Sequence, residues 1–241
     1  MAQQFPELKP KVVLGVAAHP DDLDFGMSGS AAKWVAEGAD VYYLLLTDGS
    51  KGSDDRKLTS SDLIKIRRQE QREAAKILGL KDVFFLDYED GLLVNNADVK
   101  RDIARVVRQS KPEVVVTMDP TIVYWVEMGY INHPDHRAAG QATLDAIFPL
   151  ARDHLSFPEL LAEGLEPHKV KTVLLMRFQP DNFFVDITSV IEQKLRALSA
   201  HASQMSNIEE THVLVKDWAK RAGESVGYDY AESFLRIDIL D

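Results

Sequence analysis

The chain has 241 residues, 45% of them hydrophobic and 27% charged, an ordinary globular balance that excludes disordered, collagen-like and coiled-coil chains. Its 38 acidic and 28 basic residues give a formal net charge of −10 without a basic stripe, so we expect no nucleic-acid partner. Cysteine is absent, which excludes disulfides, thiolate catalysis and sulfur-ligated zinc. Any metal ion therefore has to bind imidazole and carboxylate groups.

The apolar runs are short. The longest, residues 12–18 and 41–46, fall well below the roughly 18 to 20 residues that a membrane-spanning helix needs. The first eleven residues lack the basic segment and following apolar core of a signal peptide. We therefore expect no membrane span and a cytoplasmic location.

Short apolar runs alternate with longer amphipathic ones along the chain. In chain order, the pattern predicts a strand at 11–18, a helix at 27–37 closed by Gly38, a strand at 41–46, a helix capped by Ser60 or Ser61 and ending at Gly79, a strand at 83–86, a helix at 99–109, a strand at 113–117, a helix at 136–150, a strand at 170–176, and helices at 188–203 and 213–223. This alternation predicts an α/β, Rossmann-like three-layer fold with a mostly parallel central sheet. We expect a single domain over residues 1–241, with the part from about 165 elaborating it.

Polar motifs follow the predicted strands. AHPDD (residues 18–22) follows the first strand, TDGSKGSDD (47–55) follows the second, and HPDH (133–136) ends the loop after the fourth. In open parallel sheets, ligands bind outside the carboxyl ends of the strands where strand order reverses. A 3-2-1-4 strand order would make strands one and four neighbours and bring AHPDD and HPDH together.

These two motifs contain the donors of a catalytic zinc site. Such a site takes about three nitrogen or oxygen ligands, which His19, Asp22 and His136 can supply, and it keeps one position open for water. Adjacent Asp21 and Asp22 cannot point the same way from an extended loop, so Asp21 can face the water and accept its proton. The alternative interpretation is structural: His133 and His136 lie near a helix start, and one of them could only cap it.

Motifs along most of the chain resemble those of the PIG-L/LmbE-type zinc de-N-acetylases. They are AHPDD at 18–22, TDG at 47–49, R-x-x-E at 67–70 followed by LG at 78–79, HPDH at 133–136 and H-x-S-Q at 201–204. The resemblance implies that zinc binds His19, Asp22 and His136. This chain departs from the family pattern at Asp24, where a glutamate is frequent, and at Asn132, where an aromatic or basic residue is frequent.

The resemblance also implies roles for the other residues of the two motifs. Asp21 would be the general base, and His133, as an imidazolium, would stabilise the oxyanion of the tetrahedral intermediate. Asp135 would hydrogen-bond His133 and keep it oriented. Either Asp21, after accepting the proton of water, or His133 would protonate the leaving amine.

The resemblance implies a hydrolase that removes the N-acetyl group from an N-acetylglucosamine-type sugar or glycoconjugate and gives acetate and a free amine. The cofactor would be one Zn²⁺ per chain, with Fe²⁺ as the alternative ion in the cell, and the assembly a homo-oligomer. A metal-dependent phosphoesterase is the alternative enzyme, although its two-metal sites need more bridging carboxylates. A nucleotide-binding module is a second alternative, but HPDD stands where its glycine-rich phosphate turn would be.

Five residues are weaker candidates for substrate contacts: Arg67, Asp48, Trp125, Tyr130 and His201. All but Tyr130 have a structural alternative. Arg67 could pair with Glu70 or Glu73 on a helix surface, Asp48 could form the turn before Gly49 or orient a metal ligand, and His201 could simply end a helix. Trp125, with Tyr124, could stack on a sugar ring or pack the loop onto the core. The segment 51–57 is a candidate lid over the site.

Overall fold

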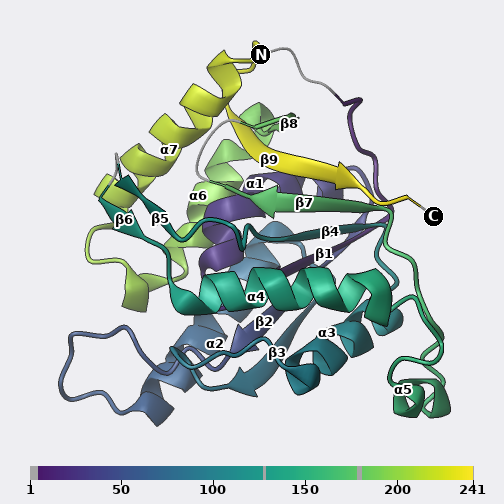
Figure 1. Ribbon diagram of the computed structural model, residues 1–241. Coiled ribbons are helices and arrows are strands. Elements are labelled where there is room, and N and C mark those ends of the chain that lie inside the picture. Colours follow the sequence, from purple (N-terminus) through teal and green to yellow (C-terminus); the bar gives the residue numbers. More distant parts are fainter. Residues whose placement is uncertain (1–4, 127–128, 178–180, 241) are drawn as a thin grey trace.

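In the computed structural model, which describes residues 5–126, 129–177 and 181–240, a seven-stranded sheet runs through the middle of the molecule (Figure 1). The strand order is β3-β2-β1-β4-β7-β9-β8. The strands are β1 (Val12–Ala17), β2 (Asp40–Thr47), β3 (Asp82–Tyr88), β4 (Val114–Met118), β7 (Thr172–Met176), β8 (Phe183–Asp186) and β9 (Ala231–Asp238). From β3 to β7 all neighbours are parallel, whereas β9 is antiparallel to both β7 and β8.

Helices cover both faces of this sheet. One face carries α1 (Asp22–Ala36), α2 (Ser60–Leu78), α6 (Ile191–Ser199) and α7 (Ile208–Glu224); the other carries α3 (Ala97–Ser110), α4 (Pro134–Asp145) and the short α5 (Pro158–Ala162). The central strands are buried on both sides: in β1, Val13 and Ala17 pack toward the first helix layer, and Leu14 and Val16 toward the second. Such strands read as continuous apolar runs, which is why β1 was visible in the sequence.

The predicted fold class is confirmed, and so is the 3-2-1-4 order of the first four strands. Several predicted boundaries were wrong. The first helix begins at residue 22 and not 27, because packing overrides the weak helix propensity of its opening Asp and Gly residues. Thr59, and neither Ser60 nor Ser61, caps α2 through a capping box with Asp62.

The second half of the chain differs more. The helix predicted at 136–150 is α4 followed by a π-helical turn at Ala146–Leu150, and the one at 188–203 is α6 between two 3-10 turns, Thr188–Val190 and Ala202–Gln204. The helix predicted at 213–223 begins at residue 208. Strands β8 and β9 were missed: β8 is only four residues long, and β9 alternates buried and partly exposed residues and pairs with strands distant in the sequence.

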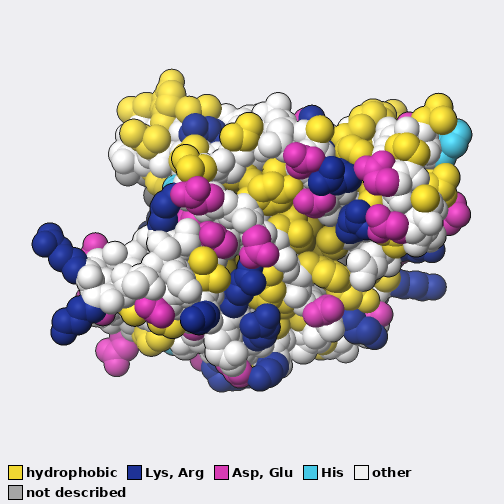
Figure 2. Space-filling model, turned by 90° about the horizontal axis from the view of Figure 1, so that it is seen from below, with side chains coloured by type: hydrophobic (Ala, Val, Ile, Leu, Met, Phe, Trp, Pro, Cys, Tyr) yellow, Lys and Arg dark blue, Asp and Glu magenta, His cyan; other side chains and the backbone are white. Residues whose placement is uncertain are grey.

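Strand β3 forms one edge of the sheet, and most of its residues are half-buried. Figure 2 looks at the molecule from below the view of Figure 1 and shows a band of hydrophobic side chains crossing that side, with charged side chains around it.

A two-stranded hairpin, β5 (Tyr124–Trp125) and β6 (Tyr130–Ile131), connects β4 to α4. Within residues 5–126, 129–177 and 181–240, no helix is both long and apolar enough to cross a bilayer.

Candidate metal centre

The loop after β1 sends two adjacent carboxylates in different directions. Asp22 is the first residue of α1, and its Oδ2 accepts a hydrogen bond from the backbone N–H of His19 at 2.8 Å. Asp21, the N-cap, has a φ of 96° and places Oδ1 3.6 Å from an Arg67 guanidinium nitrogen. The positive φ at residue 21 therefore separates the carboxylates of Asp21 and Asp22.

The predicted ligands from the two motifs meet at the carboxyl ends of β1 and β4. Asp22 lies between two histidines: its Oδ1 is 3.1 Å from His136 Nε2 and its Oδ2 is 3.4 Å from His19 Nδ1. The rings of His19 and His136 lie 5.3 Å apart, centroid to centroid. The neighbouring strands β1 and β4 thus bring together residues more than 110 positions apart, as the 3-2-1-4 order requires.

Hydrogen bonds leave one nitrogen of each histidine available to a metal. His19 Nε2 lies 3.2 Å from Asp90 Oδ1 and 3.3 Å from Asp135 Oδ2, and carboxylates only accept, so Nε2 carries a proton and Nδ1 is the nitrogen that could bind a metal. His136 Nδ1 lies 3.1 Å from Asn132 Oδ1, whose amide Nδ2 donates to the Ile122 carbonyl. His136 Nδ1 is accordingly the donor, and its Nε2 faces Asp22.

The charges at this point suit a divalent cation. Burial lowers the pKa of His19, but hydrogen bonds to Asp135, Asp22 and Asp90 outweigh it and raise the pKa to about 12. Asp22 approaches the two histidines with different oxygens, Oδ2 at 3.4 Å from His19 Nδ1 and Oδ1 at 3.1 Å from His136 Nε2. Two imidazoles and a carboxylate are donor types that zinc binds, so the chemistry of this set fits zinc.

Among the described residues, ligand atoms within 4.8 Å of one another form two groups around His19: one with His133 and His136, and one with Asp90 and Asp135. Asp22 belongs to neither group, although it contacts both His19 and His136. The carboxylates of this second group already accept backbone N–H groups, Asp90 from Lys51, and Asp135 from the Gly91–Leu93 turn. They therefore orient the His19 ring through its Nε2, as carboxylates outside the ligand shell do in zinc sites.

His133 caps α4 and also faces the centre. Its Nδ1 accepts the backbone N–H of Asp135 at 3.2 Å, and its ring lies 4.7 Å from that of His19. Burial and the neighbouring His19 lower the pKa of His133, so the neutral ring presents Nε2–H as a donor and the expected imidazolium is not favoured. The structural and chemical interpretations of this residue are compatible.

The expected contact between Asp135 and His133 takes a different form. The Asp135 carboxylate, fully buried, binds His19 and two backbone N–H groups, and only its main chain reaches His133. Asp135 thus orients the zinc-ligand candidate His19 through its side chain, and His133 through its backbone.

Arg67 is buried, which excludes the surface pair with Glu70 or Glu73. Its guanidinium donates to the carbonyls of Pro20 at 2.8 Å and of Lys51 at 3.2 Å. It therefore holds the loops after β1 and β2 together. Asp48 Oδ1 accepts the N–H groups of Ser50 and Asp90, so it forms the turn and also positions a carboxylate beside His19.

Tyr130, His201 and the loop 51–57 differ in how deeply they are buried. Tyr130 donates its hydroxyl to Asn132 Oδ1, the oxygen that contacts His136. His201 was wrongly predicted to touch substrate: it is fully buried, and its Nε2 lies 2.9 Å from Asp24 Oδ2. The proposed lid at 51–57 is an exposed loop whose first residue, Lys51, contacts the turn that carries Asp90.

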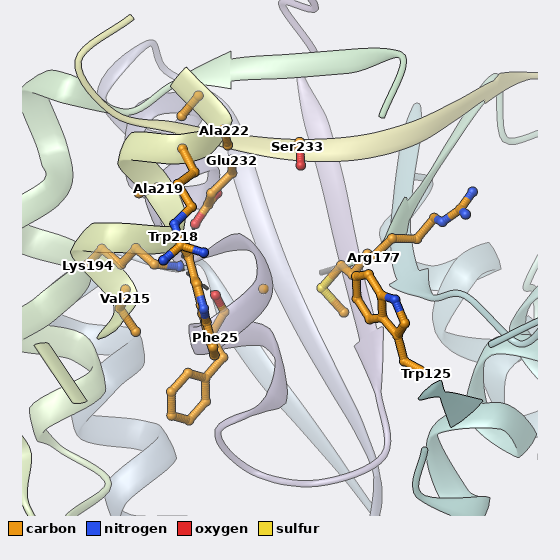
Figure 3. Close-up of a pocket in the computed structure, with 14 residues that line it drawn as sticks. Phe25, Trp125, Arg177, Lys194, Val215, Trp218, Ala219, Ala222, Glu232 and Ser233 are labelled. Atoms are coloured by element: carbon orange, nitrogen blue, oxygen red, sulfur yellow. Dashed lines mark hydrogen bonds and ion pairs between the residues drawn. The ribbon is translucent and has the colours of Figure 1, made fainter. Parts of the chain in front are cut away.

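Trp125 lines a pocket of about 360 Å³, to which none of His19, Asp22, His133 or His136 contributes. Figure 3 shows its indole on one side of the pocket and Phe25 and Trp218 on the other, with Lys194 and Glu232 behind them. Phe25 lies three residues after Asp22 on α1, and the Trp125 hairpin runs directly into His133. The pocket is therefore linked along the chain to both motifs of the centre, although no residue of the centre lines it.

Sequence reasoning missed two residues of the site. Asp90 follows β3 at the same sheet edge as the two motifs, so a carboxylate at the end of a third strand was the available signal. Asn132 was noted only as a departure from the family pattern, yet its amide determines which His136 nitrogen is free.

Comparison with known proteins agrees with this geometry. The family model described as PIG-L, GlcNAc-PI de-N-acetylase, matches residues 14–147. The chain is 36% identical to diacetylchitobiose deacetylase of Thermococcus kodakarensis, over 92% of this chain and 81% of that protein. It is 28% identical to a probable N-acetyl-alpha-D-glucosaminyl L-malate deacetylase 2 of Bacillus anthracis, over 80% and 81% of the two chains.

A solved structure is similar over nearly the whole chain. N,N'-diacetylchitobiose deacetylase from Pyrococcus horikoshii, complexed with its inhibitor MPG, aligns with a TM-score of 0.89 and 31% identity. The alignment covers 98% of this chain and 87% of that one, including the part after residue 147.

Proposed function

This chain belongs to the PIG-L family of de-N-acetylases, and on that premise we propose that it is a zinc-dependent hydrolase acting on an N-acetylglucosamine-type sugar or glycoconjugate. The products are acetate and a free amine. The observation that carries the proposal is the convergence of His19, Asp22 and His136 with a separate carboxylate, Asp21, beside them.

The residues around the centre divide the work of amide hydrolysis. His19 Nδ1, Asp22 and His136 Nε2 would hold the ion, which when bound supplies the Lewis acidity that activates water and polarises a carbonyl. Asp21 takes the proton of the attacking water; burial and the neighbouring Asp22 raise its pKa to about 6, which suits a base at neutral pH. His133 donates Nε2–H to the developing oxyanion.

The proton balance closes on the same residues. Water adds to the amide carbon, the C–N bond breaks, and the amine leaves with the proton that Asp21 took from the water, because a neutral His133 has no proton to spare. Arg67 stands behind Asp21 and contacts the loop carbonyls, so we propose that it positions the base, and that Asp48 positions Asp90. Tyr130 supports His136 through Asn132.

The relatives favour the N-acetylglucosamine unit as the common part of the substrate. One is named for a disaccharide and another for an L-malate conjugate, so the group beyond the acetylated sugar differs between them. We place that group in the pocket lined by Trp125, Phe25 and Trp218, because aromatic faces stack on sugar rings.

A panel of N-acetylated sugars tests the proposal. N-acetylglucosamine, diacetylchitobiose and an N-acetylglucosamine conjugate are incubated with the enzyme, and primary amine and acetate are measured. We expect stoichiometric release of both products, loss of activity with chelator, and recovery with zinc. No release from any member by a fully zinc-loaded preparation would overturn the proposal.

The comparisons give no support to the phosphoesterase alternative, and deacetylase relatives favour a hydrolase over a nucleotide-binding module. Metal analysis of protein purified without added zinc distinguishes Zn²⁺ from Fe²⁺ and one ion from two per chain. Cytoplasmic location and a homo-oligomeric assembly belong to the same proposal; light scattering after size exclusion tests the assembly.

A further inference from the structure

Asp21 has a backbone conformation that residues with a side chain rarely adopt. Its φ is 96° and its ψ −33°, and its side chain makes no capping hydrogen bond to α1. Such strain persists only where surrounding groups hold it, and it clusters at functional sites. Here it turns the carboxylate of Asp21 away from that of Asp22, which the proposed reaction requires.

Gln71, buried on α2, binds this strained residue. Its Oε1 accepts the backbone N–H of Asp21 at 3.1 Å, and its Nε2 donates to Asp24 Oδ2 at 2.7 Å. The orientation of the amide follows from chemistry, because a backbone N–H only donates and a carboxylate only accepts. Gln71 thus connects the backbone of Asp21 to a carboxylate in the first turn of α1.

His201 contacts the same oxygen of Asp24 that Gln71 binds. The two side chains are fully buried, with His201 Nε2 2.9 Å from Asp24 Oδ2. The backbone carbonyls of Asp24 and Phe25 accept hydrogen bonds from Lys194, which Figure 3 shows among the residues that line the pocket. Among the described residues, Asp24 Oδ1 and His201 Nδ1 have no hydrogen-bond partner.

A buried polar chain with unpaired atoms is a poor way to stabilise a core, since an apolar replacement would leave nothing unsatisfied. Local violations of this kind are expected at functional sites. One end of this series of hydrogen-bonded side chains is Gln71, which binds the backbone of the proposed base. The other end is His201, which is fully buried and lies beyond the reach of substrate.

We propose that His201, Asp24 and Gln71 form a positioning relay that holds Asp21 in its positive-φ conformation and so aims its carboxylate at the attacking water. The inference rests on the proposed function, in which Asp21 is the base. All three are positioning residues, because each acts through Asp21 and none touches the reacting atoms.

The test uses the full-length, zinc-loaded enzyme and the variants Gln71→Ala, His201→Ala and His201→Gln. The matched control is His168→Gln, which alters a partly buried histidine whose Nε2 binds the Pro112 carbonyl. We expect Gln71→Ala and His201→Ala to lower kcat about 10- to 100-fold, with KM and bound zinc nearly unchanged. His201→Gln, which keeps an N–H donor, should recover part of the lost kcat.

A double variant separates a relay from independent packing effects. Because both residues act through one carboxylate, Gln71→Ala with His201→Ala should lose little more kcat than the worse single variant. Multiplicative losses, a kcat equal to that of the His168→Gln control, or losses that only follow the zinc content would overturn the relay.

A readout without catalysis keeps this test separate from that of the proposed function. Amide hydrogen exchange of Asp21, followed by NMR, should be slow in the wild type and at least tenfold faster in Gln71→Ala. Unchanged exchange would overturn the relay. If the wild type hydrolysed no N-acetylated sugar, the proposed function would fail, while the exchange result would still decide whether Gln71 holds Asp21.

Discussion

His19 is the residue on which the charges of the site converge. Three carboxylates surround its ring, and together they overcome the effect of burial and raise its pKa to about 12. In the metal-free protein this histidine is therefore a cation at neutral pH and partly balances the surrounding negative charge. A zinc ion that takes Nδ1 as a ligand has to displace one of its protons.

Zinc binding to the metal-free enzyme should accordingly release about one proton per ion near pH 7. The sign follows from the raised pKa of His19: the proton is bound before the metal arrives and lost afterwards, so zinc affinity falls as pH falls. Calorimetric titrations in buffers of different ionisation enthalpy measure this release. Equal apparent binding enthalpies in all buffers would contradict it.

Asp21 and Asp22 differ by one position and should differ completely in their effect. Asp21→Asn keeps size and polarity but removes the base, so we expect kcat to fall by about 10² to 10⁴ with one zinc still bound. Asp22→Ala removes a ligand and should lose the metal itself. Activity assays with metal analysis distinguish the two; full activity in Asp21→Asn would refute the assignment of the base.

At the scale of elements, the hairpin β5–β6 carries Trp125 of the pocket and leads along the chain to His133. Trp125 lines the pocket, while its neighbour Tyr124 has 66% of its surface exposed and does not line it. Both residues line a second pocket of about 370 Å³, so Tyr124→Ala is a control for the first pocket alone.

Trp125→Ala should raise KM for diacetylchitobiose about 10-fold, by loss of roughly 1.4 kcal/mol of stacking, and change KM for N-acetylglucosamine much less. Tyr124→Ala should leave both values near those of the wild type. Steady-state kinetics with the two substrates provide the comparison. An equal effect of Trp125→Ala on both would remove the pocket from the substrate site.

The first half of the fold was predictable because its elements follow local rules. Strands buried on both faces appear as apolar runs, and parallel order then places AHPDD beside HPDH. The antiparallel end of the sheet could not be predicted in this way, because β9 pairs with β7 and β8, which lie far from it in the sequence. A sequence motif likewise carries no information on depth, which is why His201 looked like a substrate contact although it lies in the core.

The buried ion pair between α6 and β9 could not be predicted from the sequence either. Lys194 and Glu232 form a buried ion pair at 2.6 Å between α6 and β9, and Glu232 also accepts the backbone N–H groups of Gly29 and Ser30 in α1. Nothing in the spacing of these residues indicates that they meet. Such pairs depend on a tertiary arrangement that local patterns do not encode.

For the whole molecule, the proposed metal ion would join parts of the chain that are distant in sequence. The proposed ligands Asp22 and His136 are more than 110 positions apart, at the start of α1 and in α4. Because the unfolded chain does not hold these donors together, an ion bound there stabilises the folded state by mass action. Without the ion, the clustered carboxylates repel one another, and only the positive charge of His19 reduces this repulsion.

Removing the metal should therefore lower the melting temperature as well as the activity. Free zinc at about 1,000 times its Kd contributes roughly 4 kcal/mol, which for a chain of this size corresponds to about 8 to 16 °C. Differential scanning calorimetry with and without chelator measures the shift, and Asp22→Ala, which has lost a ligand, should melt at the same temperature in both. A wild-type melting temperature that chelator leaves unchanged would mean that no ion bridges β1 and α4, and the proposed centre would have to be abandoned.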